Sequence, residues 1–280
     1  MEIEADLHLH SNHSDGVYSP GEVVARAVSA GLRAISLTDH DTVDGVQEAI
    51  DAAPSGLEVI PGAELSCAFR GREIHVLVHY IDHTDDELRD RLEPLRQDRR
   101  LRAERMVARL RQIGIPITMD EVLEVAQGAG ARHGISLGRP HVAEVLVRHG
   151  AANDVDDAFR RYLRKGQPAY VPKPCMPLGE AVRLAKEKGG VAVIAHPALN
   201  LAEADTLALA GEGLAGIEVR HPKHTDEQRV RLDGLARQLG LIASGGSDYH
   251  GPGRSRHEIG AAGVSLDTVR LLRGASGWSV

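Results

Sequence analysis

Cysteine and aromatic side chains are scarce in this chain of 280 residues. It has two cysteines, Cys67 and Cys175, and aromatic residues make up 3% of it. The cysteines have no paired spacing, so neither a disulfide framework nor a cysteine-based zinc site is indicated. Neither begins a Cys-x5-Arg phosphate loop, because Glu73 and Ala181 stand six positions further on. With so few aromatic rings, the core must be built mainly from Ala, Val, Leu and Ile.

The sequence also lacks an excess of positive charge and any long apolar run. Its 33 basic residues are outnumbered by 40 acidic residues, for a formal net charge of −7, which argues against an extended nucleic-acid-binding surface. A local basic pocket remains compatible with this balance, particularly if metal ions neutralise some of the acids. No stretch has the length of a membrane span, and the first residues show no charged segment followed by an apolar run. We therefore expect no signal peptide, no membrane partner and a cytoplasmic location.

Histidine, in contrast, is abundant, with 15 residues. Residues 3–9 alternate between apolar and polar side chains, which predicts a strand that places His8 and His10 on the same side, roughly 6–7 Å apart. The turn signal Ser14-Asp15-Gly16 then returns a carboxylate to the end of this strand. Two imidazoles and an acid in this arrangement are typical of part of a metal site. For the His-x-His pair alone, a surface strand with a polar face is the alternative.

The next segments predict a parallel sheet. A helix from Ser19 to Gly31, a strand over 33–39, a helix through Ala53 and a strand over 57–60 have the βαβ rhythm of an α/β barrel or a doubly wound sheet. His40 and Glu64 lie just beyond strand ends, where such folds place their chemistry. The short connection at Gly71 predicts an antiparallel hairpin of strands 63–68 and 73–81. This hairpin would place His75 opposite Ser66 or Cys67, close enough to share an ion with Glu64.

Residues 84–165 interrupt this rhythm with helices alone. We expect helices over 85–110, 120–127, 139–149 and 154–163, which indicate a helical insertion packed on the barrel. The expected division is a barrel domain of residues 1–98 and 169–280 and an insertion subdomain of residues 99–168. The basic density of this helical stretch, with seven arginines from Arg96 to Arg111, is largely matched by interleaved acids, which favours a solvated helix face.

The βα rhythm resumes at Ala169. Helices are predicted at 177–188, 202–210, 225–239 and 266–273, and strands at 190–195, 216–219 and 241–244. His196 follows the first of these strands, and Asp248 and His250 follow the last. Because the carboxyl ends of barrel strands share one rim, we expect the strand-end ligands to meet there.

The predicted ligand set contains imidazoles and carboxylates only: His8, His10, Asp15, His40, Glu64, His75, His196, Asp248 and His250. Any single strand-end histidine could instead be capped by a backbone carbonyl. Six imidazoles and three carboxylates are too many for one ion, so we infer two or three divalent ions. Mixed nitrogen and oxygen ligands favour Mn²⁺, with Zn²⁺ and Fe²⁺ as alternatives.

Four motifs in the chain resemble those of the PHP (polymerase and histidinol phosphatase) superfamily. They are His8-Leu9-His10, Thr38-Asp39-His40-Asp41, Ala195-His196-Pro197 and Ser247-Asp248-Tyr249-His250. The resemblance covers residues 1–98 and 169–280 and implies a distorted seven-stranded, TIM-like α/β barrel with a trinuclear metal centre. It implies a first metal held by His8, His10, Glu64 and Asp248, a second held by Glu64, His75 and His196, and a third held by Asp15, His40 and His250.

The insertion with Gly138-Arg139-Pro140-His141, and the segment Arg220-His221-Pro222-Lys223-His224, resemble one branch of that superfamily. This branch contains the 3′,5′-nucleoside bisphosphate phosphatases, which also act as 5′→3′ exoribonucleases on short RNA. The resemblance implies a phosphorylated nucleotide or short oligonucleotide as substrate. Metal ions suit this chemistry because they lower the pKa of water from about 15.7 to near 7 and stabilise charge on phosphoryl oxygens. The catalytic residues would be His8, His10, Glu64, His196 and Asp248, acting through a metal-activated hydroxide.

The remaining phosphate charge requires cations. The candidates are Arg139, His141, Lys173, His221 and Lys223, although Arg139 could equally solvate the helix start before Pro140. Asp6, Asp39 and Asp41 are expected to orient the imidazoles.

Three other functions are consistent with the same ligands. They are a histidinol-phosphate phosphatase, a metallo-amidohydrolase and a non-catalytic PHP module. Against the amidohydrolase, no lysine is well suited to become a carbamylated bridging ligand. The sequence leaves the oligomeric state open.

Overall fold

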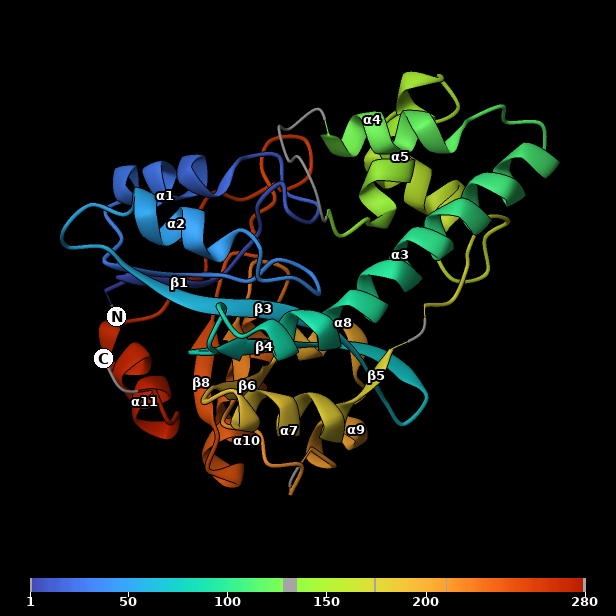
Figure 1. Cartoon of the computed structure of the whole chain (residues 1–280). Helices are drawn as coiled ribbons and strands as arrows, with labels where there is room; N and C mark the ends of the chain where they lie inside the picture. The colour runs from blue at the N-terminus through green and yellow to red at the C-terminus, as the bar shows by residue number, and fades with distance from the viewer. Residues whose placement is uncertain (1, 128–134, 174, 210, 279–280) are drawn as a thin grey trace.

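Seven strands follow one another around a nearly closed barrel in the computed structural model, which describes residues 2–127, 135–173, 175–209 and 211–278 (Figure 1). In spatial order they are β1 (Ala5–Leu9), β2 (Ala34–Leu37), β3 (Glu58–Phe69), β4 (Arg72–His79), β6 (Val191–Ile194), β7 (Gly216–Arg220) and β8 (Ile242–Gly245). A short strand, β5 (Met176–Pro177), pairs with β3 outside this path. The predicted barrel of seven strands is confirmed.

Backbone hydrogen bonds beyond β8 bring the last strand back to the first. The Asp248 N–H donates to the His8 carbonyl at 2.9 Å, and the His10 N–H donates to the Tyr249 carbonyl at 3.1 Å. The segment that carries Asp248 is therefore held directly against the segment that carries His8 and His10.

The strand predicted at 57–60 and the one predicted at 63–68 are a single strand, β3. Its first half pairs with β2 in parallel, and its second half pairs with β4 in antiparallel register. Residues 58–61 of β3 pair with β2, and residues 62–69 pair with β4, so this one strand joins the parallel and antiparallel parts of the sheet. Ser66 pairs with His75, as the hairpin prediction required.

Helices cover the outside of the barrel. They are α1 (Pro20–Ser29), α2 (Val46–Ala52), α7 (Leu178–Glu187), α8 (Pro197–Asn200), α9 (Glu203–Leu207), α10 (Asp226–Leu239) and α11 (Leu266–Ala275). The predicted start of α1 is confirmed, with Ser19 as the N-cap, Pro20 in the first turn and Glu22 completing a capping box. Among the described helices, none combines the length and hydropathy needed to cross a bilayer.

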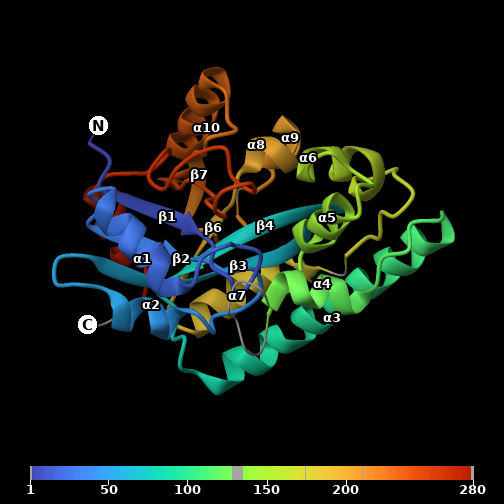
Figure 2. The same ribbon diagram turned by 90° about the horizontal axis from the view of Figure 1, so that it is seen from above.

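The insertion consists of α3 (Asp86–Gln112), α4 (Met119–Gln127), α5 (Arg139–Arg148), α6 (Val155–Ala158) and a π-helical turn, η1 (Phe159–Leu163). These elements lie to one side of the barrel (Figure 2). α3 runs unbroken past residues 98 and 99: Leu88 and Leu92 pack in the barrel's outer core, while Met106 and Leu110 pack in a separate core of the insertion. This one helix therefore contributes side chains to both cores.

The expected solvated face of α3 is wrong at two arginines. Arg99 and Arg102 are buried, at 5% and 6% exposure. Arg99 forms an ion pair with Asp41, and the Arg102 Nε donates to the Val171 carbonyl at 2.8 Å. Charge alternation along the sequence cannot show that these two side chains face the barrel and the returning segment instead of water.

Candidate metal centre

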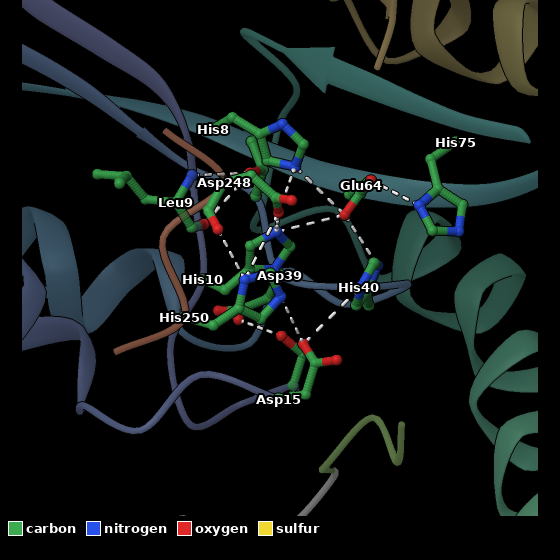
Figure 3. A network of polar contacts seen from close by, with 12 residues as sticks. His8, Leu9, His10, Asp15, Asp39, His40, Glu64, His75, Asp248 and His250 are labelled. Atoms are coloured by element: carbon green, nitrogen blue, oxygen red, sulfur yellow. Dashed lines mark hydrogen bonds and ion pairs between the residues drawn. The ribbon is translucent and has the colours of Figure 1, made fainter. Parts of the chain in front are cut away.

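The strand ends of the barrel bring all nine predicted ligands together at one rim. Four groups of ligand atoms lie within 4.8 Å of one another: His8, His10 and Asp248; His8, Glu64 and His196; His40, Glu64 and His75; and His10, Asp15, His40 and His250. Each predicted ligand belongs to at least one group, and four residues belong to two. The groups therefore form one continuous cluster, most of which is visible in Figure 3.

Glu64 lies at the middle of this cluster. It comes from β3, is fully buried, and has imidazole nitrogens around both carboxylate oxygens. The distances to Oε2 are 3.3 Å from His8 Nε2, 3.3 Å from His10 Nε2 and 2.9 Å from His40 Nδ1, and those to Oε1 are 2.7 Å from His75 Nδ1 and 3.1 Å from His196 Nε2. Burial alone would raise the pKa of the Glu64 carboxyl, but the charges of His40 and His75 hold it well below its usual range.

Unusual backbone conformations occur after the strand ends, at two of the residues in this cluster. His196 and Asp248 have positive φ angles of 31° and 52°, in the left-handed region that costs a non-glycine residue of order 1–3 kcal/mol. Gly246 permits the close approach of β1, because a Cβ atom there would lie 2.3 Å from the His8 Cβ. The local geometry is thus strained or tightly packed where the ligands converge.

Several buried atoms in the cluster are acceptors that face other acceptors. Within the described part of the chain, His8 Nε2, His10 Nε2, His40 Nδ1, Asp15 Oδ1 and Glu64 Oε2 have no hydrogen-bond partner. A buried polar atom left in this state costs about 1–3 kcal/mol. Lone pairs of imidazoles and carboxylates that converge in this way are the donor set of a divalent cation. The residues present therefore fit bound metal ions.

The pKa values of two neighbouring imidazoles are displaced in opposite directions. Burial lowers the pKa of His10, but the carboxylates of Asp248 and Glu64, at 3.4 and 3.3 Å from its Nε2, outweigh burial and raise the pKa to about 9. Burial lowers the pKa of His40 to about 3, against the opposing charges of Glu64 and Asp15. The carboxylates near His10 therefore create a place that favours positive charge.

Glu218 was not identified from the sequence, although it contacts two of the candidate ligands. Its side chain is fully buried on β7; Oε1 lies 3.0 Å from His8 Nδ1, and Oε2 accepts the His196 backbone N–H at 2.6 Å. Because Nδ1 of His8 is engaged by Glu218, Nε2 is directed toward Glu64 and Asp248. An acid between Ile217 and Val219 in a predicted strand was the available signal.

The expectation that Asp6, Asp39 and Asp41 orient imidazoles is wrong. Asp6 accepts the backbone N–H groups of Ser247 and Gly260, at 2.9 and 2.7 Å. Asp39 accepts from Ser11 and Ser14, and Asp41 accepts from Ser66 and Arg99. These carboxylates hold the loops that carry the ligands, because backbone and hydroxyl donors surround them.

Two of the predicted substrate residues lie beside Asp248. Lys223 is exposed, with Nζ 3.7 Å from Asp248 Oδ2. His221 is buried; its Nδ1 accepts the Lys223 backbone N–H at 3.2 Å, and its Nε2 lies 3.3 Å from Asp248 Oδ2. With Nδ1 acting as an acceptor, Nε2 carries the hydrogen that His221 donates to Asp248.

The other three predicted substrate residues lie among protein groups. The His141 Nδ1 accepts the Gly138 N–H at 3.1 Å, and burial lowers the pKa of His141 to about 4. The Lys173 side chain is 2% exposed beside Glu73, at 3.6 Å, and burial lowers its pKa to about 8. The guanidinium of Arg139 lies 5.5 Å from the centre of the Phe159 ring.

Arg254, which sequence reasoning also missed, joins the rim to the insertion. Its Nη1 donates to the Asp15 carbonyl at 2.6 Å, and its Nη2 donates to Glu144 of α5 at 2.7 Å. It also lines a cavity of about 750 Å³ together with Asp248, His250 and Lys223. The candidate metal centre therefore opens into a cavity with cationic side chains in its wall.

This chain is similar to several known proteins over most of their length. The 5′-3′ exoribonuclease of Haemophilus influenzae is 34% identical over 258 residues, which cover 90% of this chain and 92% of the relative. The 3′,5′-nucleoside bisphosphate phosphatase of Chromobacterium violaceum is 34% identical over 261 residues, which cover 91% of this chain and 90% of the relative.

Solved structures are also similar to nearly the whole chain. A candidate metal-dependent phosphoesterase from Bifidobacterium adolescentis has a TM-score of 0.89 at 34% identity, covering 98% of this chain and 97% of that one. A Chromobacterium violaceum structure named as an amidohydrolase, with bound sulfate and no metal, has a TM-score of 0.86 at 32% identity and the same coverage. Residues 6–125 match the PHP domain. With this match and relatives aligned over nine-tenths of its length, the chain belongs to the PHP family.

Proposed function

We propose that the protein is a metal-dependent phosphoesterase that removes the 3′-phosphate of nucleoside 3′,5′-bisphosphates. Adenosine 3′,5′-bisphosphate would yield AMP and phosphate, and the same site would act 5′→3′ on short RNA. The observation that carries this proposal is the cluster of unsatisfied acceptors around Glu64, which opens into a cavity with cationic groups. The names of the two relatives, an exoribonuclease and a bisphosphate phosphatase, support the substrate class.

The nine rim residues would hold two or three divalent ions, for which Mn²⁺ is our first candidate and Zn²⁺ and Fe²⁺ are alternatives. The four ligand groups overlap at Glu64, His8, His10 and His40, so the ions held by these residues would lie close to one another. When bound, such ions polarise phosphoryl oxygens and lower the pKa of water toward neutrality.

The side chains of the protein position the ligands and the substrate. Glu218 fixes the orientation of His8 and holds the backbone of His196. His221 donates to Asp248 and so fixes one carboxylate oxygen of that ligand. Among the five candidate substrate residues, Lys223 is the best placed to meet a phosphate, because it is exposed, lines the cavity and lies beside Asp248. Arg139, His141, Lys173 and His221 remain candidates of the same proposal.

A phosphate-release panel tests this function. The protein is stripped of metal, reconstituted with Mn²⁺ and supplied with adenosine 3′,5′-bisphosphate, 3′-AMP, 5′-AMP, histidinol phosphate and a 5′-phosphorylated short RNA. We expect the bisphosphate to be hydrolysed with the highest kcat/KM and AMP to be the nucleotide product. Stripped protein without added Mn²⁺ is the control and should be inactive.

Two results would contradict the proposal. Preferential hydrolysis of histidinol phosphate would place the protein with the other phosphatases of the family. Turnover of an amide substrate without phosphate release would instead agree with the name of the second structural neighbour.

A further inference from the structure

The cavity beside the metal centre has walls from both parts of the molecule. From the barrel it is lined by Asp248, His250 and Lys223, and from the insertion by Phe159 and Arg164. Its volume of about 750 Å³ is in the range of small-molecule sites. A ligand with one end at the metal ligands can therefore also contact the insertion.

Phe159 and Arg164, which line the same cavity, stand at the two ends of a rare backbone feature. They bound the π-helical turn η1, and the Arg164 N–H donates to the Phe159 carbonyl five residues earlier, at 2.9 Å. An α-helix would instead pair Phe159 with Leu163, which is buried in the core of the insertion. Single π-turns inside helices occur frequently at functional sites.

The two side chains, an aromatic ring and a guanidinium, together suit a ligand that has both a nucleobase and a phosphate. Phe159 is one of only two phenylalanines in the chain, and the Arg139 guanidinium lies near its ring. Aromatic rings stack on nucleobases with little dependence on base identity. Arg164 adds a planar guanidinium, whose donors match phosphate oxygens.

We propose that Phe159 and Arg164 form the subsite for the part of the substrate that is not hydrolysed. Phe159 stacks on the nucleobase, and Arg164 binds the 5′-phosphate. This inference rests on the proposed function, since it takes the 3′-phosphate to lie at the metal centre. It assigns recognition of the nucleoside to the insertion and hydrolysis to the barrel.

The experiment compares Phe159→Leu, Phe159→Trp and Arg164→Gln with Arg160→Gln as the matched control. Arg160 lies in the same turn, is exposed and forms an ion pair with Asp157. Each protein, reconstituted with Mn²⁺, is assayed on adenosine 3′,5′-bisphosphate, 3′-AMP and p-nitrophenyl phosphate. Binding of the product AMP is measured separately by calorimetry, and circular dichroism checks that each variant is folded.

For Phe159→Leu we expect KM for the bisphosphate to rise, and AMP affinity to fall, by about 10-fold. Its kcat, and its kcat/KM for p-nitrophenyl phosphate, should stay within about twofold, because no transition-state contact is lost. Phe159→Trp should restore binding. Arg164→Gln should raise KM about 10-fold for the bisphosphate but leave 3′-AMP, which has no 5′-phosphate, unchanged.

Unchanged KM and AMP affinity in both variants would overturn the inference. An equal loss on p-nitrophenyl phosphate would also overturn it, because it would indicate a structural role. If the wild-type protein does not hydrolyse the bisphosphate, the proposed function fails, but AMP binding still decides the subsite. In that case, AMP binding that Phe159→Leu weakens supports the inference, and no AMP binding by the wild type rejects it.

Discussion

The rim of the barrel differs from the cavity wall between the barrel and the insertion in how its charged groups are paired. The wall is the set of cavity-lining residues that includes Phe159, Arg164, Lys223, Arg254 and Arg256. At the rim, nitrogen and oxygen atoms from strand ends converge around Glu64, and several of them have no hydrogen-bond partner among the residues that the structure describes. At the wall, cations are already paired with carboxylates, as in Arg254 with Glu144 and Arg256 with Asp156. The rim residues could therefore hold cations, whereas the wall carries cationic side chains of its own. This difference indicates that hydrolysis and substrate recognition can be altered separately.

The largest effect is expected from Glu64→Gln, which removes the central charge of the rim. Bound metal supplies several kcal/mol of transition-state stabilisation, so we expect kcat/KM to fall by about 10³-fold and metal content to drop. Phosphate release and elemental analysis measure both. Glu187→Gln, an exposed change on α7, should leave both unchanged. Wild-type turnover in the Glu64 variant would show that the rim does not drive the reaction.

The next largest effect is expected on stability, from Arg99→Met. Arg99 lies on α3, which leads into the insertion, and it pairs with Asp41 of the barrel. This change leaves the buried Asp41 without its ion-pair partner, which typically costs 3–5 kcal/mol of unfolding free energy. Urea unfolding measures the loss. The neighbouring Arg100→Met changes an exposed pair with Glu104 and should cost within about 0.5 kcal/mol.

A second substitution sharpens this prediction. Asp41→Asn added to Arg99→Met removes the uncompensated charge, so we expect the double variant to be more stable than Arg99→Met alone. If Arg99→Met and Arg100→Met are equally stable, the ion pair between Arg99 and Asp41 does not contribute to stability as its burial indicates.

A smaller effect is expected from Glu218→Gln, which keeps the shape of the side chain but removes its charge. Outer partners of this kind typically contribute 10–100-fold to metal affinity, and Glu218 is the partner of His8. Mn²⁺ titration against a competing chelator measures the change. Affinity equal to that of Glu187→Gln would mean that His8 needs no orientation by Glu218.

The smallest effect is expected where the wall touches the rim. Arg254→Gln disrupts the bonds to the Asp15 carbonyl and to Glu144, and we expect about 10-fold weaker Mn²⁺ binding at the Asp15 end of the cluster. Arg256→Gln breaks only an exposed pair, worth about 0–1 kcal/mol, and should not change Mn²⁺ binding. Equal metal binding by these two variants would remove the proposed link between wall and rim.

The meeting of the nine candidate ligands could be predicted because strand ends lie at one rim whatever the details of packing. Alternation placed His8 and His10 on one side, and hairpin register placed His75 opposite Ser66. Glu218 was not found in this way, because it lies inside β7 and not at a strand end, and its contact with His8 depends on how the strands pack.

The wall was harder to predict because it depends on how the insertion packs. The sequence of η1 is typical of an ordinary helix, so the π-turn that pairs Phe159 with Arg164 has no evident signal. Likewise, nothing in the alternating charges of α3 separates the buried Arg99 from the exposed Arg100. Side chains that are set by tertiary packing carry no periodic pattern of their own.

Anomalous diffraction at the manganese edge, from crystals of the protein reconstituted with Mn²⁺, tests the central claim most directly. The account predicts two or three peaks among the nine rim side chains, all within coordination distance of the ligand groups that share Glu64, His8, His10 and His40. Diffraction of good quality with no peak at the rim would contradict it.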